Sequence, residues 1–403
     1  MTTTCGAWMA TCATPSRAMA LARCFASTTQ PSPVGTLKAH AHPWFPGHMK
    51  KASEQLRKLL KAADVVVEVR DARAPLTAAS DTLRAASVVG TSERTAAARR
   101  KHVVALNKSD LADPSLMRKS ERAVAEDERR RGNIAFAGVV HTSCAKTNRN
   151  SLRGASPLLK KVREALVDVP RRARPGDPHL LIICGLPNVG KSALIAGLRR
   201  ANSDGEDDRE HIRGRGGKAR VGPTPGVTRA VQGFELTGGD EPLWCLDSPG
   251  ITAPRLREGR AVEHAMHLAI VHCVPEYITG GADTTLGYAL AHVVPNAASP
   301  VEMGRPPEAV LNVHAHVRRS REQDTMLKAA RAGSEAAKVA YRDGENDTVA
   351  SAMALDAALV HMMNGTSVND ADPDRVQKLV DKLLKAVREG RLGRFNVDRD
   401  SIV

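Results

Sequence analysis

Residues 185–192 fit the pattern G-x-x-x-x-G-K-[ST], in which two glycines enclose a loop and a lysine and a serine follow the second glycine. The apolar run 180–184 before this phosphate loop predicts a buried strand, and the chain from Lys191 onward predicts a helix. Glycines allow backbone N–H groups to turn inward around phosphate oxygens, and a helix N-terminus adds the positive end of its dipole. The residue types and their spacing therefore predict a binding site for the phosphates of a nucleotide.

The side chains that follow the loop have separate expected tasks. Lys191 is expected to reach the β- and γ-phosphates of the nucleotide, and Ser192 is expected to hold Mg²⁺. The predicted phosphate-binding residues are Gly185, Asn188, Val189, Gly190, Lys191, Ser192 and, from a later segment, Gly250.

Two further segments are expected to complete the magnesium site. Asp247 and Gly250 follow the apolar run 243–246 in a D-x-x-G pattern, in which the carboxylate takes Mg²⁺ through water and the glycine amide senses the γ-phosphate. Thr224 and Thr228 lie between this segment and the phosphate loop, and a threonine in a mobile loop can enter the Mg²⁺ shell when a γ-phosphate is present. The predicted magnesium ligands are Ser192, Asp247 and Thr228, with Thr228 preferred over Thr224.

Residues 107–110 have the sequence N-K-S-D and follow the apolar run 103–106. In this base loop the carboxylate of Asp110 is expected to accept from both N1–H and the 2-amino group of guanine. Adenine does not present that pair of donors, so the motif favours GTP over ATP and counts against an ATP-dependent kinase. The next predicted strand ends at residues 142–146, which can contact the base oxygen through the backbone. The predicted guanine-binding residues are Asn107, Lys108, Asp110, Ser143, Cys144 and Ala145.

The segments that must position these residues alternate between two kinds. Short apolar or β-branched runs at 65–69, 103–106, 139–140, 180–184, 231–236 and 243–246 predict strands, and residues 49–63 and 151–167 predict helices. Such alternation predicts an α/β fold, a P-loop GTPase domain with a mainly parallel sheet, followed by a C-terminal α-helical domain. The base loop precedes the phosphate loop, so the two can share one site only if the sheet is circularly permuted.

The composition indicates a polyanionic partner. The chain has 403 residues, a net charge of +15 and a pI of about 9.8, while aromatic residues make up 3%. These values favour phosphate contacts through Lys and Arg over base stacking on aromatic side chains. We expect three parts: a disordered transit peptide over 1–40, a permuted GTPase domain over 41–254 with a charged loop at 202–222, and a basic helical RNA- or ribosome-binding domain over 255–403.

Residues 1–40 contain no Asp or Glu and are rich in Ser and Thr, which is typical of an organellar transit peptide. Arg17 and Arg23 interrupt the apolar run that a secretory signal requires, and composition alone does not separate mitochondrion from plastid. No apolar run reaches 18 residues, so no transmembrane helix is expected.

The cysteines and histidines form no pattern that predicts a metal site. The seven cysteines form no C-x-x-C pair, and Cys184 and Cys245 lie in apolar runs, where they are expected to be buried. No acidic partner completes a metal site with His264, His267 and His272, and we expect these histidines on a solvated or RNA-facing surface.

The motifs in this order resemble the YlqF/RbgA-type circularly permuted GTPases, and most of all their mitochondrial members. The likeness begins at residues 44–49 (W-F-P-G-H-M), continues through residues 71–75 (D-A-R-A-P) and the nucleotide motifs, and is weak near the C-terminus. The resemblance implies a GTP-hydrolysing assembly factor for the mitochondrial large ribosomal subunit, located in the matrix, with GTP or GDP and ribosomal RNA as partners. The inner membrane is a further expected partner, through peripheral association.

The resemblance also implies how hydrolysis is supported. Ile251 occupies the position where Ras-type enzymes place a water-orienting Gln, and the family's substitute is the histidine that matches His48. The plain alternative is that His48 only packs or contacts RNA at a helix start. Asn188 matches an asparagine that some P-loop GTPases use to coordinate K⁺, so K⁺-stimulated hydrolysis is expected.

Two other functions compete with this interpretation. One is a nucleotide-gated rRNA-binding scaffold with negligible turnover, which Ile251 would permit. The other is a relative that acts on nuclear or cytosolic pre-ribosomes, against which the acid-free N-terminus speaks.

Overall fold

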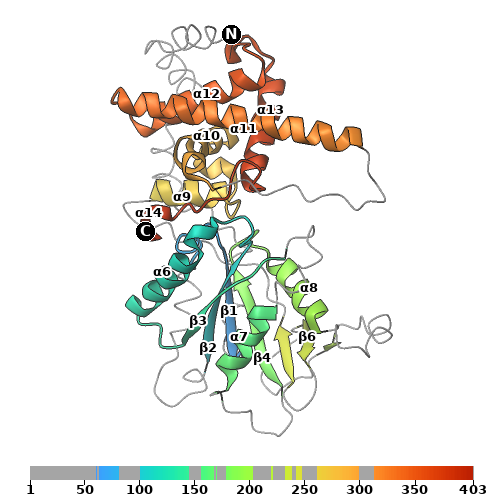
Figure 1. The fold of residues 1–403 in the computed structure, drawn as a ribbon. Coiled ribbons are helices and arrows are strands. Elements are labelled where there is room, and N and C mark those ends of the chain that lie inside the picture. The colour runs from blue at the N-terminus through green and yellow to red at the C-terminus, as the bar shows by residue number, and fades with distance from the viewer. Residues whose placement is uncertain are drawn as a thin grey trace. The chain divides into compact units, whose positions relative to one another are not determined.

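The computed structural model describes residues 60, 63–80, 100–144, 156–167, 169, 178–202, 219–220, 232–237, 242–246, 261–298 and 313–402 (Figure 1). Two compact units account for them: Pro43–Arg255 with Asp398–Val403, and Leu256–Val397 with Met1–His42. We call the first the sheet unit and the second the helical unit. The last six residues, which were expected in the helical part, belong to the sheet unit.

The sheet unit is built on one seven-stranded sheet. In chain order its strands are β1 (Val65–Asp71), β2 (Lys101–Asn107), β3 (Phe136–His141), β4 (His179–Gly185), β5 (Ala219–Arg220), β6 (Gln232–Thr237) and β7 (Leu243–Leu246). They lie in the order β3-β2-β1-β4-β7-β6-β5, with β1 to β4 and β7 parallel and the β6 pairings antiparallel. The predicted α/β class with a mainly parallel sheet is confirmed.

Helices connect the parallel strands and cover both faces of the sheet (Figure 1). Helix α6 (Met117–Arg130) connects β2 to β3, and α7 (Ser156–Leu166) connects β3 back across the sheet to β4. These connections run in opposite directions, so right-handed crossovers place α6 and α7 on opposite faces. Helix α8 (Lys191–Asn202) follows β4, as predicted, and the short α14 (Arg399–Ile402) packs near α6.

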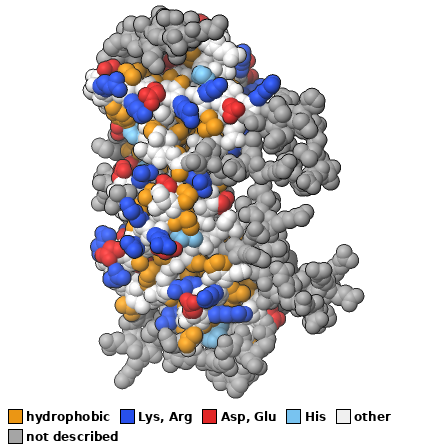
Figure 2. Space-filling view, in the orientation of Figure 1, with side chains coloured by type: hydrophobic (Ala, Val, Ile, Leu, Met, Phe, Trp, Pro, Cys, Tyr) orange, Lys and Arg blue, Asp and Glu red, His pale blue; other side chains and the backbone are white. Residues whose placement is uncertain are grey.

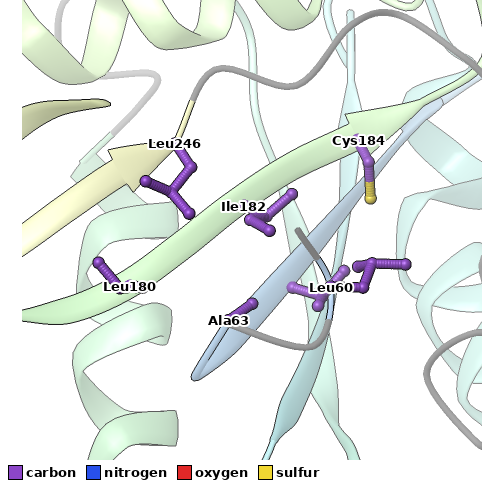
Figure 3. Packing of buried hydrophobic residues seen from close by; sticks show 7 residues of the cluster. Leu60, Ala63, Leu180, Ile182, Cys184 and Leu246 are labelled. Carbon is purple, nitrogen blue, oxygen red and sulfur yellow. The ribbon is translucent and has the colours of Figure 1, made fainter. Parts of the chain in front are cut away.

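One apolar cluster fixes β1, β4 and β7 to each other. Its side chains come from alternate residues of the strands, because successive side chains of a strand point to opposite faces. The members are Leu60, Ala63, Val66, Leu180, Ile182, Cys184 and Leu246 (Figure 3). Cys184 and Cys245 are buried, as expected. Of the helix predicted over residues 49–63, only Leu60 and Ala63 lie within the described residues.

The helical unit contains helices but no named strand in its described ranges, 261–298 and 313–397. Its elements are α9 (Ala261–Ile270), η4 (Glu276–Thr279), α10 (Ala282–Tyr288), η5 (Ala289–Val293), η6 (Val294–Asn296), α11 (Val313–Arg342), α12 (Asp347–Met362), η8 (Val368–Asp370) and α13 (Pro373–Arg388). Small residues let three helices pack closely: a Cβ on Gly287 or Gly333 would lie 2.6 Å from the carbonyl oxygen of Ser351 or Ala354. No described helix is long and apolar enough to cross a bilayer.

Two expectations about the helical part are wrong. His264 and His267 are buried in α9, at 7% and 9% exposure, because they point inward with the apolar residues around them. Only His272, beyond the end of α9, is exposed. Residues 255–403 are also not basic: they contain 19 Lys and Arg against 20 Asp and Glu, a net charge of −1. The acidic residues of the turns and helix starts offset the lysines of α13.

Candidate nucleotide-binding site

Both nucleotide motifs lie at the carboxyl edge of the sheet. The base loop follows β2 and the phosphate loop follows β4, with β1 paired between these two strands. The register places Asp71 opposite Asn107 and Val69 opposite Gly185. Parallel strands end at the same edge, where ligands of open α/β sheets bind, so the two loops reach one site across a single strand.

The phosphate loop is shaped by its backbone. Gly185, Asn188 and Gly190 have φ angles of 146°, 58° and 94°, and asparagine is the non-glycine residue that tolerates this left-handed region best. A Cβ on Gly185 would lie 2.2 Å from the carbonyl oxygen of Val69, so only glycine lets β4 approach β1 here. Lys191 Nζ donates to the carbonyl oxygens of Gly185 at 3.1 Å and of Leu186 at 2.6 Å, which holds the ammonium over the loop.

Asn107 joins the base loop to the phosphate loop. Its Nδ2 donates to the Val189 carbonyl at 2.8 Å, and its Oδ1 accepts from Thr142 Oγ1 at 3.0 Å. A Cβ on Gly190 would lie 2.4 Å from Asn107 Nδ2, so the second glycine of the motif makes room for this contact. Asn107 is 2% exposed. It was predicted as a guanine-binding residue. In the structure its side chain connects the two loops through hydrogen bonds.

The carboxylate predicted to recognise the base is oriented by the neighbouring strand. Ser143 Oγ donates to Asp110 Oδ1 at 2.6 Å, and Ser109 Oγ donates to the Thr142 carbonyl at 3.0 Å. Residues Ser143 and Cys144 follow β3 and are half-buried. The structure therefore brings Asp110 together with the segment expected to contact the base oxygen.

Lys108 has a partner that was not predicted from the sequence. Its Nζ lies 3.0 Å from Asp71 Oδ2, and the Arg73 guanidinium donates to both oxygens of the same carboxylate at 2.8 Å. Burial of Asp71 opposes its ionisation, but Arg73 and Lys108 outweigh burial and hold the pKa of this carboxyl well below its usual range. The D-A-R-A-P motif thus supplies a charged anchor for the lysine of the base loop. The charged residues within this motif, 71–75, were the sequence signal that could have indicated the contact.

The loop after β1, residues 72–80, is anchored near its middle from two sides. Arg70 donates to the Pro75 carbonyl at 3.2 Å. Asp398 accepts from the backbone amides of Leu76 and Thr77 at 2.7 and 2.8 Å, and also from the Thr77 hydroxyl. The segment Asp398–Val403 therefore helps to fix the loop that carries Arg73.

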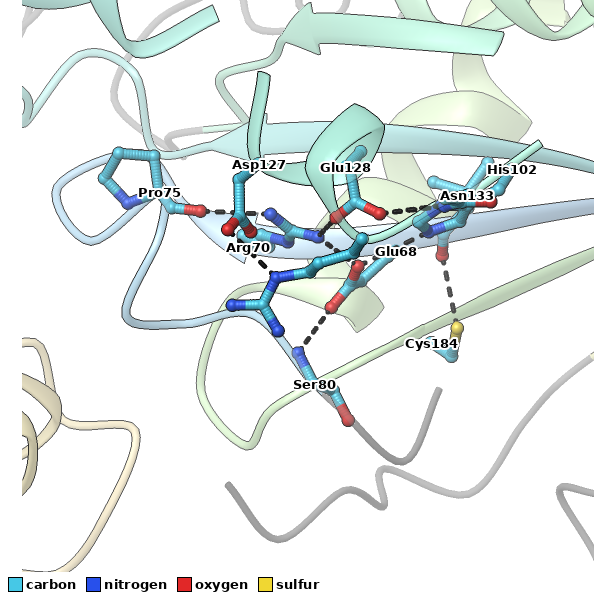
Figure 4. Close-up of polar contacts among 11 residues, drawn as sticks. Glu68, Arg70, Pro75, Ser80, His102, Asp127, Glu128, Asn133 and Cys184 are labelled. Atoms are coloured by element: carbon cyan, nitrogen blue, oxygen red, sulfur yellow. Dashed lines mark hydrogen bonds and ion pairs between the residues drawn. The ribbon is translucent and has the colours of Figure 1, made fainter. Parts of the chain in front are cut away.

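A buried ionic network lies under this loop (Figure 4). Arg70 donates to Glu68 at 2.6 Å and to Glu128 of α6 at 2.5 Å, and Glu68 also accepts from the Ser80 amide at 2.8 Å. Burial disfavours the charged form of Glu68, but Arg70 and His102 hold its pKa well below the usual range. The same carboxylates raise the pKa of Arg70 against its burial. The network ties β1 to α6 beneath the base loop.

Several predicted site residues lie outside the described residues. They are His48, Ala145, Thr228, Asp247 and Gly250. Ser192 is described: it is the second residue of α8, is exposed, and its hydroxyl has no partner among the described residues.

A family model and several curated proteins are similar to this chain. Residues 181–289 match a family model described as 50S ribosome-binding GTPase, which begins inside β4, so the base loop lies upstream of it. "Short integuments 2, mitochondrial" of Arabidopsis thaliana is 33% identical over 59% of this chain and 53% of its own length. "Mitochondrial ribosome-associated GTPase 1" of Mus musculus is 32% identical over 61% of this chain and 65% of its own length.

A bacterial relative belongs to the same set. "Ribosome biogenesis GTPase A" of Bacillus cereus is 31% identical over 53% of this chain and 60% of its own length. The chain is therefore similar to GTPases named for mitochondria and for the ribosome. It spans between about half and two thirds of the length of these relatives. The crystal structure of GNP-bound YlqF from T. maritima is 18% identical, covers 86% of this chain and 97% of that one, and has a TM-score of 0.41.

Mg²⁺ is the metal that P-loop GTPases generally use, and the residues at the phosphate end of this site fit it. The exposed Ser192 hydroxyl, at the helix start, has no hydrogen bond to any residue that the structure describes, and Lys191 brings its positive charge to the same loop. A hydroxyl oxygen beside nucleotide phosphates is the kind of donor that Mg²⁺ accepts.

Proposed function

We propose that this protein binds and hydrolyses GTP and uses its nucleotide state to control docking on, and release from, the large ribosomal subunit of mitochondria. One observation carries the proposal: Asn107 bonds the base loop to the Val189 carbonyl of the phosphate loop at 2.8 Å. That bond makes the two motifs parts of one site, with Asp110 at one end and Lys191 at the other.

The base end suits guanine. A carboxylate held by Ser143 can accept from two neighbouring N–H donors, and Lys108, fixed by Asp71, covers the loop beside Gly190 with its aliphatic stem. Charge-assisted hydrogen bonds contribute about 1.5–3 kcal/mol each. Two of them to Asp110 are enough to discriminate GTP from ATP by orders of magnitude.

The phosphate end suits a triphosphate. Residues 185–190 present backbone amides, and Lys191 leaves its two carbonyl partners to meet the phosphate oxygens. Ser192, Thr228 and Asp247 would hold Mg²⁺, which supplies charge neutralisation at the β- and γ-phosphates. Gly250 completes the predicted set by donating its amide toward the γ-phosphate.

Water is positioned by groups other than the usual glutamine. Because Ile251 cannot hydrogen-bond, His48 takes the role of orienting the attacking water. The exposed Asn188, in its left-handed conformation at the loop tip, would hold K⁺, which would supply a fixed positive charge beside the phosphates. Both roles follow the sequence expectation.

The partner and the compartment follow from the relatives' names and from the N-terminus. The relatives, of which between about half and two thirds of the length is matched, are named for mitochondria, for the ribosome or for both. Residues 1–40 have the composition of a transit peptide. The protein acts in the matrix on the large subunit and its rRNA. Peripheral contact with the inner membrane is a secondary part of this proposal.

A scaffold with negligible turnover is the second candidate, because Ile251 removes the common water-positioning side chain. Single-turnover GTP hydrolysis with and without mitochondrial large subunits separates the two. An enzyme is stimulated by subunits, is faster in K⁺ than in Na⁺, and loses turnover in Lys191→Ala and, with affinity kept, in His48→Ala. Equal, negligible turnover in all samples with intact GTP binding supports the scaffold.

A further inference from the structure

The positive charge of the chain is concentrated in one part of the sequence. Residues 43–255 contain 38 Lys and Arg against 24 Asp and Glu, a net charge of +14, whereas Leu256–Val397 contains 17 against 18, a net charge of −1. A polyanion is therefore attracted to residues 43–255 rather than to residues 256–397.

Within the described residues, the outer face of α6 concentrates unpaired basic side chains. Arg118, Lys119 and Arg122 are exposed and have no ion pair among the described residues. The three lie within about 6 Å along the helix axis, at 1.5 Å per residue. In the space-filling view, Lys and Arg side chains gather over α6 (Figure 2).

The acidic residues of α6 are committed elsewhere. Glu126 pairs with Arg129 at 2.7 Å and with Arg130 at 3.5 Å, Glu128 is buried against Arg70, and Glu121 lies 3.3 Å from the ring of His141. The three basic side chains nearer the helix start thus keep their charge for a ligand.

Helix α13 of the helical unit offers the opposite arrangement. Lys382 lies 2.5 Å from Glu322, and Lys385 lies 3.9 Å from Glu389. Asp372 caps the start of α13 and Asp374 lies in its first turn. Its lysines are therefore partly neutralised by neighbouring carboxylates.

We propose that the α6 face formed by Arg118, Lys119 and Arg122 binds the phosphate backbone of RNA. A lipid surface is disfavoured, because the apolar side chains of this segment are committed to the core: Leu116 and Val124 are 3% and 0% exposed. A helix with charge but no free apolar face contacts a polyanion through phosphates alone. The inference rests on the proposed function in taking the RNA to be ribosomal, and it assigns the contact to the sheet unit.

The test is fluorescence anisotropy of the full chain, bound to a non-hydrolysable GTP analogue, with a labelled 16-bp RNA duplex between 50 and 200 mM salt. Arg118→Ala/Lys119→Ala/Arg122→Ala is compared with Arg375→Ala/Lys378→Ala/Lys385→Ala, which removes three exposed charges from α13. Alanine favours the helix at every one of these positions, and far-UV circular dichroism checks that both variants fold.

We expect the α6 variant to bind RNA at least about tenfold more weakly and to lower the slope of log K against log salt by about 2–3, while the α13 variant stays within about twofold of wild type. Unchanged RNA binding by the α6 variant overturns the proposal. The proposal is also overturned if the α6 variant loses binding only to phosphatidylserine vesicles, measured in parallel by sedimentation. GTP affinity, measured on the same samples, is expected to stay unchanged; if wild type binds no GTP, the proposed function fails separately from this inference.

Discussion

The two ends of the candidate site are built in different ways. The base end is held by side chains: Asp110 accepts from Ser143, and Lys108 is fixed by Asp71. The phosphate end is shaped by backbone conformation, with positive φ angles at Gly185, Asn188 and Gly190. Short polar side chains can orient a flat base, whereas phosphates need many inward amides.

This difference shows what a permuted chain must preserve. The sheet consists of a first segment, β1 to β3, and a second segment from β4 onward. The two segments meet where glycines leave room, at Gly185 against Val69 and at Gly190 against Asn107. Both glycines of the phosphate motif therefore also serve the junction between the two segments. The order of the motifs along the chain is free, while the close approach at this junction is not.

The largest expected effect is at the charged anchor of the base end. Asp71→Asn leaves Arg73 and Lys108 without their carboxylate, and breaking a buried pair costs about 3–5 kcal/mol of unfolding free energy. Chemical denaturation measures the loss, and nucleotide titration should show weaker GTP binding because Lys108 is released. A variant as stable as wild type would show that Asp71 does not organise the base end.

The same substitution has a pH signature. The pKa of Asp71 is held below its ordinary value of 3.8 in the folded state, so the unfolded chain binds more protons as the solution becomes acidic. The stabilisation is fully present above about pH 4 and is lost as pH falls through 3.8 toward the folded pKa. Denaturation of Asp71→Asn should therefore vary less with pH below 4 than that of wild type, and equal slopes would contradict this.

The next effect is at the junction itself. Gly190→Ala places a Cβ 2.4 Å from Asn107 Nδ2 at a φ of 94°. Crowding and backbone strain together should cost about 2–4 kcal/mol and separate the two loops, which thermal unfolding and GTP titration would detect.

Gly132→Ala is the matched control. Gly132 also has a positive φ, 67°, but a Cβ there meets nothing within 4 Å. It should lose only about 1 kcal/mol from backbone strain and should keep GTP affinity. Equal losses in the two variants would mean that the contact between the loops is unimportant.

The smallest effect is at the orienting serine. Ser143→Ala removes one hydrogen bond to Asp110 and leaves a carboxylate that water can still reach, so GTP affinity should fall by about fivefold, equivalent to ~1 kcal/mol. Isothermal titration calorimetry measures it. A loss of a hundredfold or more would make Ser143 a direct partner of the base.

Local signals predicted most of the sheet and half of the site. The β-branched runs of β1, β2 and β4 and the motifs at 107–110 and 185–192 were sufficient because strand ends and loop glycines are local properties. Helix α6 was missed, since its charged sequence hides an inward face of Ser120, Val124 and Glu128.

Long-range partners could not be predicted in this way. The bond from Lys108 to Asp71 and the capping of Leu76 and Thr77 by Asp398 join segments that only the folded sheet brings together. A helical part was predicted over residues 255–403, but the bounds of α12 within it were not, although Asn346 caps its start, because Asp, Asn and Gly before the helix are typical of loops.

The central claim is that one guanine nucleotide spans Asp110 and Lys191, and base specificity tests it most directly. Competition titrations of GTP and xanthosine triphosphate would be measured for wild type, Asp110→Asn and Lys191→Ala. An amide donates where the carboxylate accepts, and xanthine has a carbonyl in place of the 2-amino group. We therefore predict that Asp110→Asn exchanges preference from GTP to xanthosine triphosphate at one site per chain, while Lys191→Ala weakens GTP without changing base preference. Retained GTP preference in Asp110→Asn, or two independent sites, would contradict the account.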